Sequence, residues 1–290
     1  MKLNGSVPKK ETRTLFRPDM QKEEFYTHLC EELRQNPALY PYYKLTHGSE
    51  QQQRFRKSYF MQRLAYLEKY IDTSKPLNIW DCGCGYGTTG LFLAMNGIPS
   101  MGSSLEYYID QLENRRRFWQ QYGDPSLFSY RYANIFDQDI APETFDIIIM
   151  QDTLHHIEPV DKALNLFYAA LKKGGKLILI EENGACILKN LMLFLKRGNK
   201  KIVEIYDEKL QKNLLMGNEN VRSEKQWLEL FRKTPFTLLE DSLSYIRILP
   251  PCSYRKRSVQ EVEHIEQSVW YPKTWFREHC FFGLNMVFVK

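Results

Sequence analysis

Residues 79–90, Ile-Trp-Asp-Cys-Gly-Cys-Gly-Tyr-Gly-Thr-Thr-Gly, form a short apolar run, a glycine-rich turn and the start of a helical segment. Gly83, Gly85 and Gly87 let the backbone turn tightly and let a ligand lie against the main chain, because they carry no Cβ. Asp81 stands two residues before the first glycine, where its charge would repel a phosphate and attract an ammonium group. The stretch therefore predicts a strand, a loop and a helix that bind a nucleotide-like ligand with an amino group near the turn.

The chain continues with an alternation of strands and helices. Residues 145–150 form an almost continuous apolar run, which is typical of a strand buried on both faces. Leu-His-His-Ile at 154–157 follows, and then a helical apolar pattern covers residues 163–171. That pattern ends at Lys-Lys-Gly-Gly, 172–175, where lysines and glycines favour a helix stop. Residues 176–181 are the next expected strand.

These patterns together resemble the class I S-adenosylmethionine-dependent methyltransferases. The first family motif, acid-x-Gly-x-Gly-x-Gly, matches 81–87, and later motifs match 152–157 and 172–175 at similar spacing. The resemblance covers about 76–182. It implies an α/β fold, with a Rossmann-like seven-stranded methyltransferase sheet and helices on both faces. It also implies S-adenosyl-L-methionine as the cofactor, whose amino-acid end carries no phosphate.

The resemblance assigns individual cofactor contacts. The residues that would surround the methionine end are Asp81 and the backbone of Gly83, Gly85 and Gly87. Asn134, just past an expected strand at 128–133, matches the position that meets the adenine amino group, and Ile135 would lie on the adenine ring. Gln151 matches a position whose main chain faces the amino group of the cofactor.

The ribose position departs from the usual family pattern. The second strand normally ends in an acid that binds both ribose hydroxyls, but Met-Gly-Ser-Ser-Leu-Glu at 101–106 places Ser104 there. This resembles the Gly-x-Thr-Leu-Ser variant of cyclopropane-synthase-like and tocopherol-type methyltransferases, where a hydroxyl replaces the acid. Glu106 either returns to the ribose or forms a capping box with Ser103 at the start of the next helix.

Two adjacent histidines are the candidates for chemistry. Methyl transfer depends first on in-line positioning, and an oxygen acceptor such as a phenol also benefits from a base near neutral pH. The resemblance places His155 and His156 where the fourth strand opens toward the acceptor. We predict His155 as the catalytic base and assign a structural role to His156. Asp152 and Glu181 or Glu182 either orient His155 or are solvated charges at strand ends.

The composition predicts a cytoplasmic enzyme. The chain begins without an apolar secretion signal. Its apolar cluster at 185–195 is interrupted by Lys189 and Asn190 and is shorter than the ~20 residues of a membrane span. The six cysteines form no framework, and Cys82 and Cys84 have no matching pair for zinc, so we expect no metal. An excess of 40 Lys and Arg over 35 Asp and Glu is too small to indicate nucleic acid.

The chain divides into a cover and a catalytic domain. The predicted units are 1–75, a helical N-terminal segment covering the active site, and 76–290, a methyltransferase domain with insertions at 183–222 and 244–280. The N-terminal helices either cover the cofactor and shape the acceptor pocket or pack on the sheet edge without touching a ligand. Residues 281–289 are expected to form the last, antiparallel strand, paired with 236–243.

The first insertion contains an amphipathic segment. Residues 191–195 are largely apolar and precede Lys196, Arg197, Lys200 and Lys201. They form either a lid under a solvated basic rim or a contact with a lipid surface, and the lid is the preferred interpretation.

The sequence thus predicts a methyltransferase that acts on a small aromatic or lipid-like molecule, with nucleic acid an unlikely partner. One alternative is a methyltransferase acting on RNA or on a carrier-bound intermediate. Another is a non-catalytic, cofactor-binding regulatory partner of a second subunit. The sequence does not identify the acceptor atom or the oligomeric state.

Overall fold

The computed structural model describes residues 19–105 and 107–290 and has an α/β fold. Its strands are β1 Ile79–Cys82, β2 Ser100–Ser104, β3 Phe128–Tyr132, β4 Phe145–Gln151, β5 Leu171–Glu182, β6 Ile202–Asp207, β7 Lys212–Gly217, β8 Thr237–Leu238, β9 Ser244–Ile246 and β10 Gly283–Val289. Its α-helices are α1 Lys22–Gln35, α2 Tyr40–Tyr43, α3 Glu50–Tyr70, α4 Thr88–Met95, α5 Leu112–Trp119, α6 Val160–Ala170, α7 Ile187–Arg197, α8 Glu224–Phe231, α9 Val259–Ile265 and α10 Thr274–Cys280.

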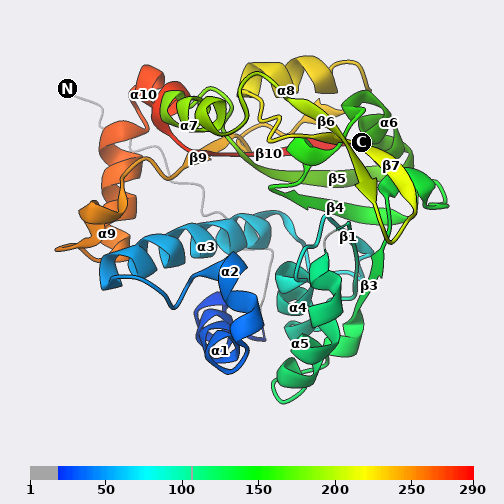
Figure 1. Ribbon diagram of the computed structural model, residues 1–290, viewed down its shortest axis with the longest axis horizontal. Helices are drawn as coiled ribbons and strands as arrows, with labels where there is room; N and C mark the ends of the chain where they lie inside the picture. Colours follow the sequence, from blue (N-terminus) through cyan, green and yellow to red (C-terminus); the bar gives the residue numbers. More distant parts are fainter. Residues whose placement is uncertain (1–18, 106) are drawn as a thin grey trace, which may run out of the picture.

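One large sheet forms the centre of the molecule (Figure 1). Its strand order is β3-β2-β1-β4-β5-β10-β8, and β9 pairs with the other end of β10. The first five strands of this order run parallel, whereas β10 runs antiparallel to β5, β8 and β9. Helices cover both faces, with α4 and α5 on one side and α6 and α8 on the other (Figure 1). The predicted Rossmann-like methyltransferase topology is confirmed.

Burial on both faces explains why the central strands are apolar along their whole length. In β4, Ile148, Ile149 and Met150 are all completely buried, as expected of a parallel strand between two helical layers. The carboxyl ends of the parallel strands meet at one edge of the sheet, which is where ligands bind in open α/β folds.

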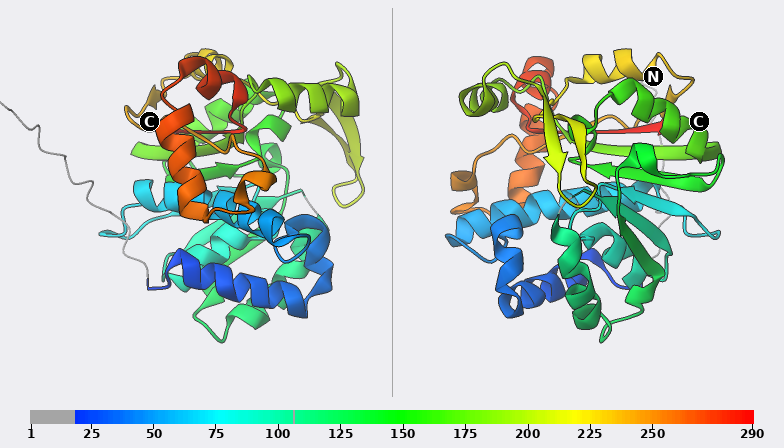
Figure 2. Two further views of the ribbon diagram at one scale, coloured as in Figure 1. Left: turned by 90° about the vertical axis from the view of Figure 1, so that its left-hand side faces the viewer. Right: turned by 45° about the vertical axis from the view of Figure 1, so that its right-hand side comes forward.

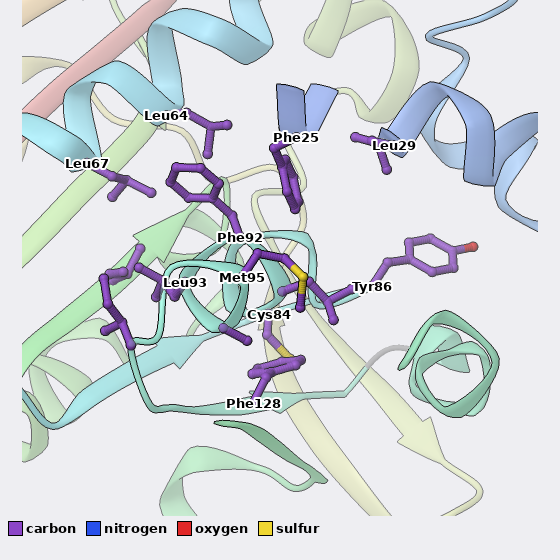
Figure 3. Close-up of a cluster of buried hydrophobic side chains, with 14 of the residues drawn as sticks. Phe25, Leu29, Leu64, Leu67, Cys84, Tyr86, Phe92, Leu93, Met95 and Phe128 are labelled. Atoms are coloured by element: carbon purple, nitrogen blue, oxygen red, sulfur yellow. The ribbon is translucent and has the colours of Figure 1, made fainter. Parts of the chain in front are cut away.

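The N-terminal helices belong to the hydrophobic core. Phe25 and Leu29 of α1 and Leu64 of α3 lie in one buried cluster with Phe92 of α4 (Figure 3). The rings of Phe25 and Phe92 meet edge to face at 5.2 Å. The α1 and α3 helices are therefore held on the sheet by the same packing that holds α4.

The segment after β5 leaves the body of the molecule. It forms α7 and then a separate two-stranded sheet in which β6 and β7 pair antiparallel. In the left view of Figure 2 the helix and the hairpin project together from one side of the molecule.

Two element boundaries differ from the prediction. The helix α6 ends at Ala170 and β5 begins at Leu171, because Leu171 already pairs with Phe145 before a register shift. The second predicted insertion, 244–280, begins with β9, so its first residues belong to the sheet. The division into a cover and a catalytic domain stays a prediction. Among the described residues, none of the helices combines the length and the apolarity needed to cross a membrane.

Candidate active site

The glycine loop between β1 and α4 has the backbone that its sequence predicts. Gly83, Gly85 and Gly87 have φ angles of 79°, 51° and 70°, in the left-handed region that glycine adopts without strain. The N–H groups of Gly83 and Cys84 donate to the carbonyl of Ser103 at 2.8 and 3.0 Å, which closes the turn against β2. A Cβ on Gly83 would lie 2.2 Å from the side chain of Thr153. The loop therefore requires glycine for both conformation and space.

Gly87 serves packing in this structure. A Cβ there would lie 2.4 Å from Phe128 and 2.5 Å from Leu112, and neither described cavity near the loop is lined by Gly87. The space beside its Cα is filled by Phe128 and Leu112, and its assignment as a residue that surrounds the cofactor stays a prediction. Gly87 holds α4 close to the sheet, which is the known task of a third glycine in such loops.

Asp81 faces a small cavity on the α3 side of the loop. The cavity measures about 100 Å³ and is also lined by Tyr43, Arg63, Thr88 and Gln151. Asp81 is 2% exposed, and burial raises the pKa of its carboxyl to about 7. Its Oδ2 atom has no hydrogen-bond partner among the described residues. A buried carboxylate oxygen without a partner is costly, so this position is suited to a cationic ligand group.

A larger cavity lies on the other side of Gly83. Its volume is about 540 Å³, and its lining contains most of the predicted cofactor residues, namely Gly83, Gly85, Ser104, Asn134, Ile135 and Gln151. Gly83 and Gln151 line both cavities, so the two adjoin at these residues. Ser104 ends β2 and is buried. The predicted ribose candidate Glu106 lies outside the described residues.

Asn134 stabilises the local backbone in addition to its predicted contact with adenine. It caps the short helix Ile135–Asp137, with its Oδ1 atom accepting from the N–H of Phe136 at 3.2 Å. A carbonyl oxygen has two lone pairs, so Oδ1 retains the capacity to accept a second hydrogen bond. Ile135 is buried and supplies an apolar surface beside it.

His155 and Glu181 form a buried pair at the same cavity. His155 is 2% exposed and Glu181 is fully buried, and the Nδ1 atom of His155 binds Oε2 of Glu181. Oε1 of Glu181 accepts the backbone N–H groups of Thr153 at 3.1 Å and Leu154 at 2.6 Å. Burial lowers the pKa of His155, but the charge of Glu181 outweighs it and raises the pKa to about 9. At neutral pH His155 is therefore an imidazolium.

The β6–β7 hairpin covers this cavity. Val203, Ile205, Leu214 and Met216 line its wall. At its base the carbonyl of Gly217 lies 2.9 Å from Nδ1 of His156. This contact agrees with a structural role for His156.

The far end of the hairpin contacts β3 of the large sheet and two aspartates outside the sheet. Tyr132 at the end of β3 donates to Asp207 of β6 at 2.5 Å. Lys209 forms an ion pair with Asp110 at 3.0 Å, and Lys212 forms one with Asp137. The hairpin thus spans the cavity from the His155 loop to the end of β3.

The structure adds site residues that the sequence interpretation did not name. Arg63 of α3 lines the small cavity and forms an ion pair with Asp152 at 2.7 Å. Its position between Phe60 and Leu64, on an otherwise apolar face, is a signal that could have revealed it. Glu219 places Oε2 3.9 Å from Nε2 of His155, and nothing in the sequence pattern indicates that contact. The other predicted orienting group, Glu182, lies on the cavity wall.

Comparison with known proteins agrees with this geometry. Residues 80–179 match the family model described as "Methyltransferase domain". A structure from Listeria monocytogenes, described as a putative S-adenosylmethionine-dependent methyltransferase, superposes with a TM-score of 0.53 at 16% identity, over 81% of this chain and 98% of that one. Residues 80–179 therefore form a class I S-adenosylmethionine-dependent methyltransferase domain, and S-adenosylmethionine is the methyl donor of such a domain.

Two curated proteins have weak sequence similarity to the chain. The chain is 22% identical to "O-methyltransferase resE" from Aspergillus sclerotiorum over 194 residues, which is 67% of each protein. It is 26% identical over 133 residues, 40% of this chain, to "Probable polyketide synthase 42" from Dictyostelium discoideum. The match spans 5% of the length of that synthase.

The described residues fit S-adenosylmethionine. The unpartnered Oδ2 of Asp81 offers an acceptor for an ammonium group, and Gly83 and Gly85 line the larger cavity. Ser104, Asn134 and Ile135 supply the polar and apolar contacts that a nucleoside requires. Among the described residues, no cluster of three or more His, Cys, Asp and Glu side chains is arranged to hold a metal ion.

Proposed function

We propose that the protein methylates a small aromatic or lipid-like molecule on an oxygen atom. The observation that carries the proposal is that one cavity extends from Ser104, Asn134 and Ile135, the predicted nucleoside contacts, to His155 under an apolar hairpin. Its volume of about 540 Å³ lies within the usual range for small-molecule sites. One curated relative is named an O-methyltransferase, which supports an oxygen acceptor.

Different residues of the chain are proposed to bind different parts of the donor. Asp81 binds the ammonium group of the methionine end, and Arg63, across the small cavity, binds its carboxylate. Ser104 donates to or accepts from the ribose, and Asn134 accepts from the adenine amino group over Ile135. When bound, S-adenosylmethionine supplies an electrophilic methyl group on a sulfonium. The remaining requirement is to position an acceptor oxygen, which can account for much of the rate.

His155 is proposed to act as the base, and the Glu181 carboxylate controls its protonation state. Glu181 holds Nδ1, which leaves Nε2 as the nitrogen that can take a proton from an acceptor hydroxyl in the cavity. Because the pKa of His155 is raised to about 9, the neutral imidazole is a minority form at pH 7. We therefore expect the base-assisted rate to increase with pH up to about 9.

A roofed cavity disfavours a large acceptor. The hairpin is fixed at both ends over the cavity, by Gly217 at its base and by Asp207 near its tip. A long nucleic acid would have to displace these contacts, whereas a small molecule can enter before closure. The same argument disfavours acceptors carried on large proteins unless the carrier delivers a flexible arm.

The test is a methylation assay with radiolabelled S-adenosylmethionine and three kinds of acceptor: simple phenols, long-chain lipophilic phenols, and total RNA. The proposal expects labelled phenols or lipophilic phenols, with activity that changes less than about threefold between 50 and 200 mM salt. An RNA acceptor held through about six phosphates would lose roughly 1,000-fold in affinity over that range. Activity on RNA alone would refute the proposal. Tight donor binding with no labelled product would favour a regulatory partner.

A further inference from the structure

The helix α7 exposes its apolar side to solvent. Six of its side chains are between 54% and 76% exposed, namely Ile187, Leu188, Leu191, Met192, Phe194 and Leu195. Leu193 is buried. At about 100° per residue, the six side chains cover an arc of roughly 160° without a polar interruption. Surface helices normally turn the apolar arc toward the core, so the orientation of α7 is reversed.

Opposite the apolar arc, α7 contacts the protein through the buried Leu193 and through basic side chains. Lys189 forms an ion pair with Glu182 at 2.5 Å, and Lys196 forms one with Glu219 at 3.4 Å. Arg197 donates to the backbone carbonyl of Glu219 at 3.2 Å. Lys189 and Lys196 also line the larger cavity. Turning the apolar arc inward as a lid would break these contacts, so the structure does not favour the lid interpretation.

The hairpin extends the apolar surface. Ile202, Ile205, Tyr206 and Leu215 are between 44% and 54% exposed. Ile205 and Leu215 also line the larger cavity, so the apolar surface reaches the wall of the candidate active site. Helix and hairpin project together from the body of the molecule (Figure 2, left view). We call α7 and the β6–β7 hairpin the apolar platform.

The charges on the platform indicate what covers it. Residues 187–201 contain five basic side chains and no acidic one. Lys200 and Lys201 lie just beyond the end of the helix, after Gly198 and Asn199. Neither lysine forms an ion pair with any described residue. An antiparallel pair of α7 helices in a symmetric dimer would cover the apolar arc but would bring no opposite charge to these lysines. An anionic lipid surface instead satisfies both the apolar arc and its basic end.

We propose that the apolar platform binds the interface of a membrane containing anionic lipids and draws the methyl acceptor from that membrane. The evidence for the membrane contact is the exposed apolar arc of α7 together with the basic side chains of residues 187–201. The source of the acceptor rests on the proposed function, because Ile205 and Leu215 connect the platform to the cavity. Burial of six apolar side chains, together with two or more basic residues, matches the composition of helices that lie in the interfacial plane.

The experiment measures co-sedimentation of the whole protein with vesicles, in the absence of any methyl acceptor. Vesicles of phosphatidylcholine alone are compared with vesicles of phosphatidylcholine that contain about 30% phosphatidylglycerol, an anionic lipid. We expect binding to the anionic vesicles. The variant Leu191→Ser/Leu195→Ser should lower the partition coefficient at least about tenfold, since two exposed anchors are lost. Lys200→Glu/Lys201→Glu should lower it by about tenfold or more and reduce its salt dependence.

A matched charge control lies elsewhere on the surface. Lys173 is exposed near the start of β5, at the end of that strand opposite to α7, so Lys173→Glu should bind vesicles as the unchanged protein does. Donor binding and thermal midpoint should be the same in all three variants. Failure to bind anionic vesicles, or unchanged binding by the Leu191/Leu195 variant, would overturn the membrane contact. So would a dimer that dissociates in that variant. Vesicle binding without methylation of any small acceptor would overturn the proposed function alone.

Discussion

The N-terminal helices and the apolar platform line different cavities that adjoin at Gly83, and their apolar side chains differ in exposure. Phe25, Leu29 and Leu33 of α1 are completely buried. In α7 six apolar side chains are exposed, and Lys189 and Lys196 form ion pairs with the rest of the protein. The N-terminal helices bury their apolar side chains in the core of the chain itself. The apolar platform leaves its apolar side chains exposed, as expected of a surface that binds a partner outside the chain.

The N-terminal cover is also joined to the glycine loop by a buried ion pair. Arg115 of α5 donates to both carboxylate oxygens of Glu32 in α1, at 2.9 and 2.8 Å. The same guanidinium donates to the carbonyl of Tyr86 at 2.6 Å and to Thr88 at 2.8 Å. Arg115 is completely buried. The cover therefore cannot move away from the loop without exposing or separating these charges.

Removing one partner of this pair should have the largest effect on stability. We expect Arg115→Met to lower the free energy of unfolding by about 3–5 kcal/mol, because it leaves the Glu32 carboxylate buried without its partner. Leu191→Ser on the platform should change it by less than about 0.5 kcal/mol, since that side chain is 55% exposed. Urea denaturation measures both.

The double variant Arg115→Met/Glu32→Met serves as the control for this comparison. Replacing both charges with apolar groups should recover much of the loss. Equal destabilisation by Arg115→Met and Leu191→Ser would contradict the distinction between the two regions.

The next effect concerns the cavity under the hairpin. Below about pH 9 His155 is protonated, so kcat should rise with pH toward that value, and His155→Gln should lower kcat roughly 100-fold at pH 9. His156→Gln, whose ring contacts Gly217, should keep the rise. The pH–rate profile of all three proteins decides the matter. A profile of the same shape in His155→Gln would show that the acceptor's own ionisation causes the rise.

The His155–Glu181 pair also makes stability depend on pH. The folded pKa of His155 lies above its ordinary value of about 6.5. The pair therefore stabilises the fold fully below that pH, and its contribution is lost as pH rises through about 9. The thermal midpoint of His155→Gln should accordingly differ most from the unchanged protein at low pH and least above pH 9.

A smaller effect is expected on the side of the N-terminal cover. Arg63→Gln should weaken S-adenosylmethionine binding by about tenfold, because it removes a charged hydrogen-bond donor from the small cavity. Lys57, on the same helix, does not line that cavity, so Lys57→Gln is the matched control. Calorimetric titration of both variants checks this. Unchanged affinity in Arg63→Gln would mean that α3 covers the donor site without contacting the donor.

Sequence periodicity predicted the sheet because every central element has a strong local signal. The glycine loop, the apolar run of β4 and the capped helix α8 each carry their signal within a few residues. The candidate site was harder to predict from the sequence, because its cavities are formed by segments that are distant along the chain. Arg63 and Asp152, which form an ion pair, are 152 − 63 = 89 residues apart in the sequence. Glu219 and His155 are 219 − 155 = 64 residues apart. Hydrophobic pattern also could not tell which way α7 turns its apolar side.

The most direct test of the central claim is a titration of the protein with S-adenosylmethionine and, separately, with NAD, followed by thermal unfolding. If the glycine loop and Asp81 hold an amino-acid donor, S-adenosylmethionine at 100 times its dissociation constant should stabilise the fold by about 2.7 kcal/mol. NAD should leave it unchanged. Gly83→Ala should abolish the effect, because its Cβ would lie 2.2 Å from Thr153 and its φ of 79° disfavours any side chain. Stabilisation by NAD, or none by S-adenosylmethionine, would contradict the account.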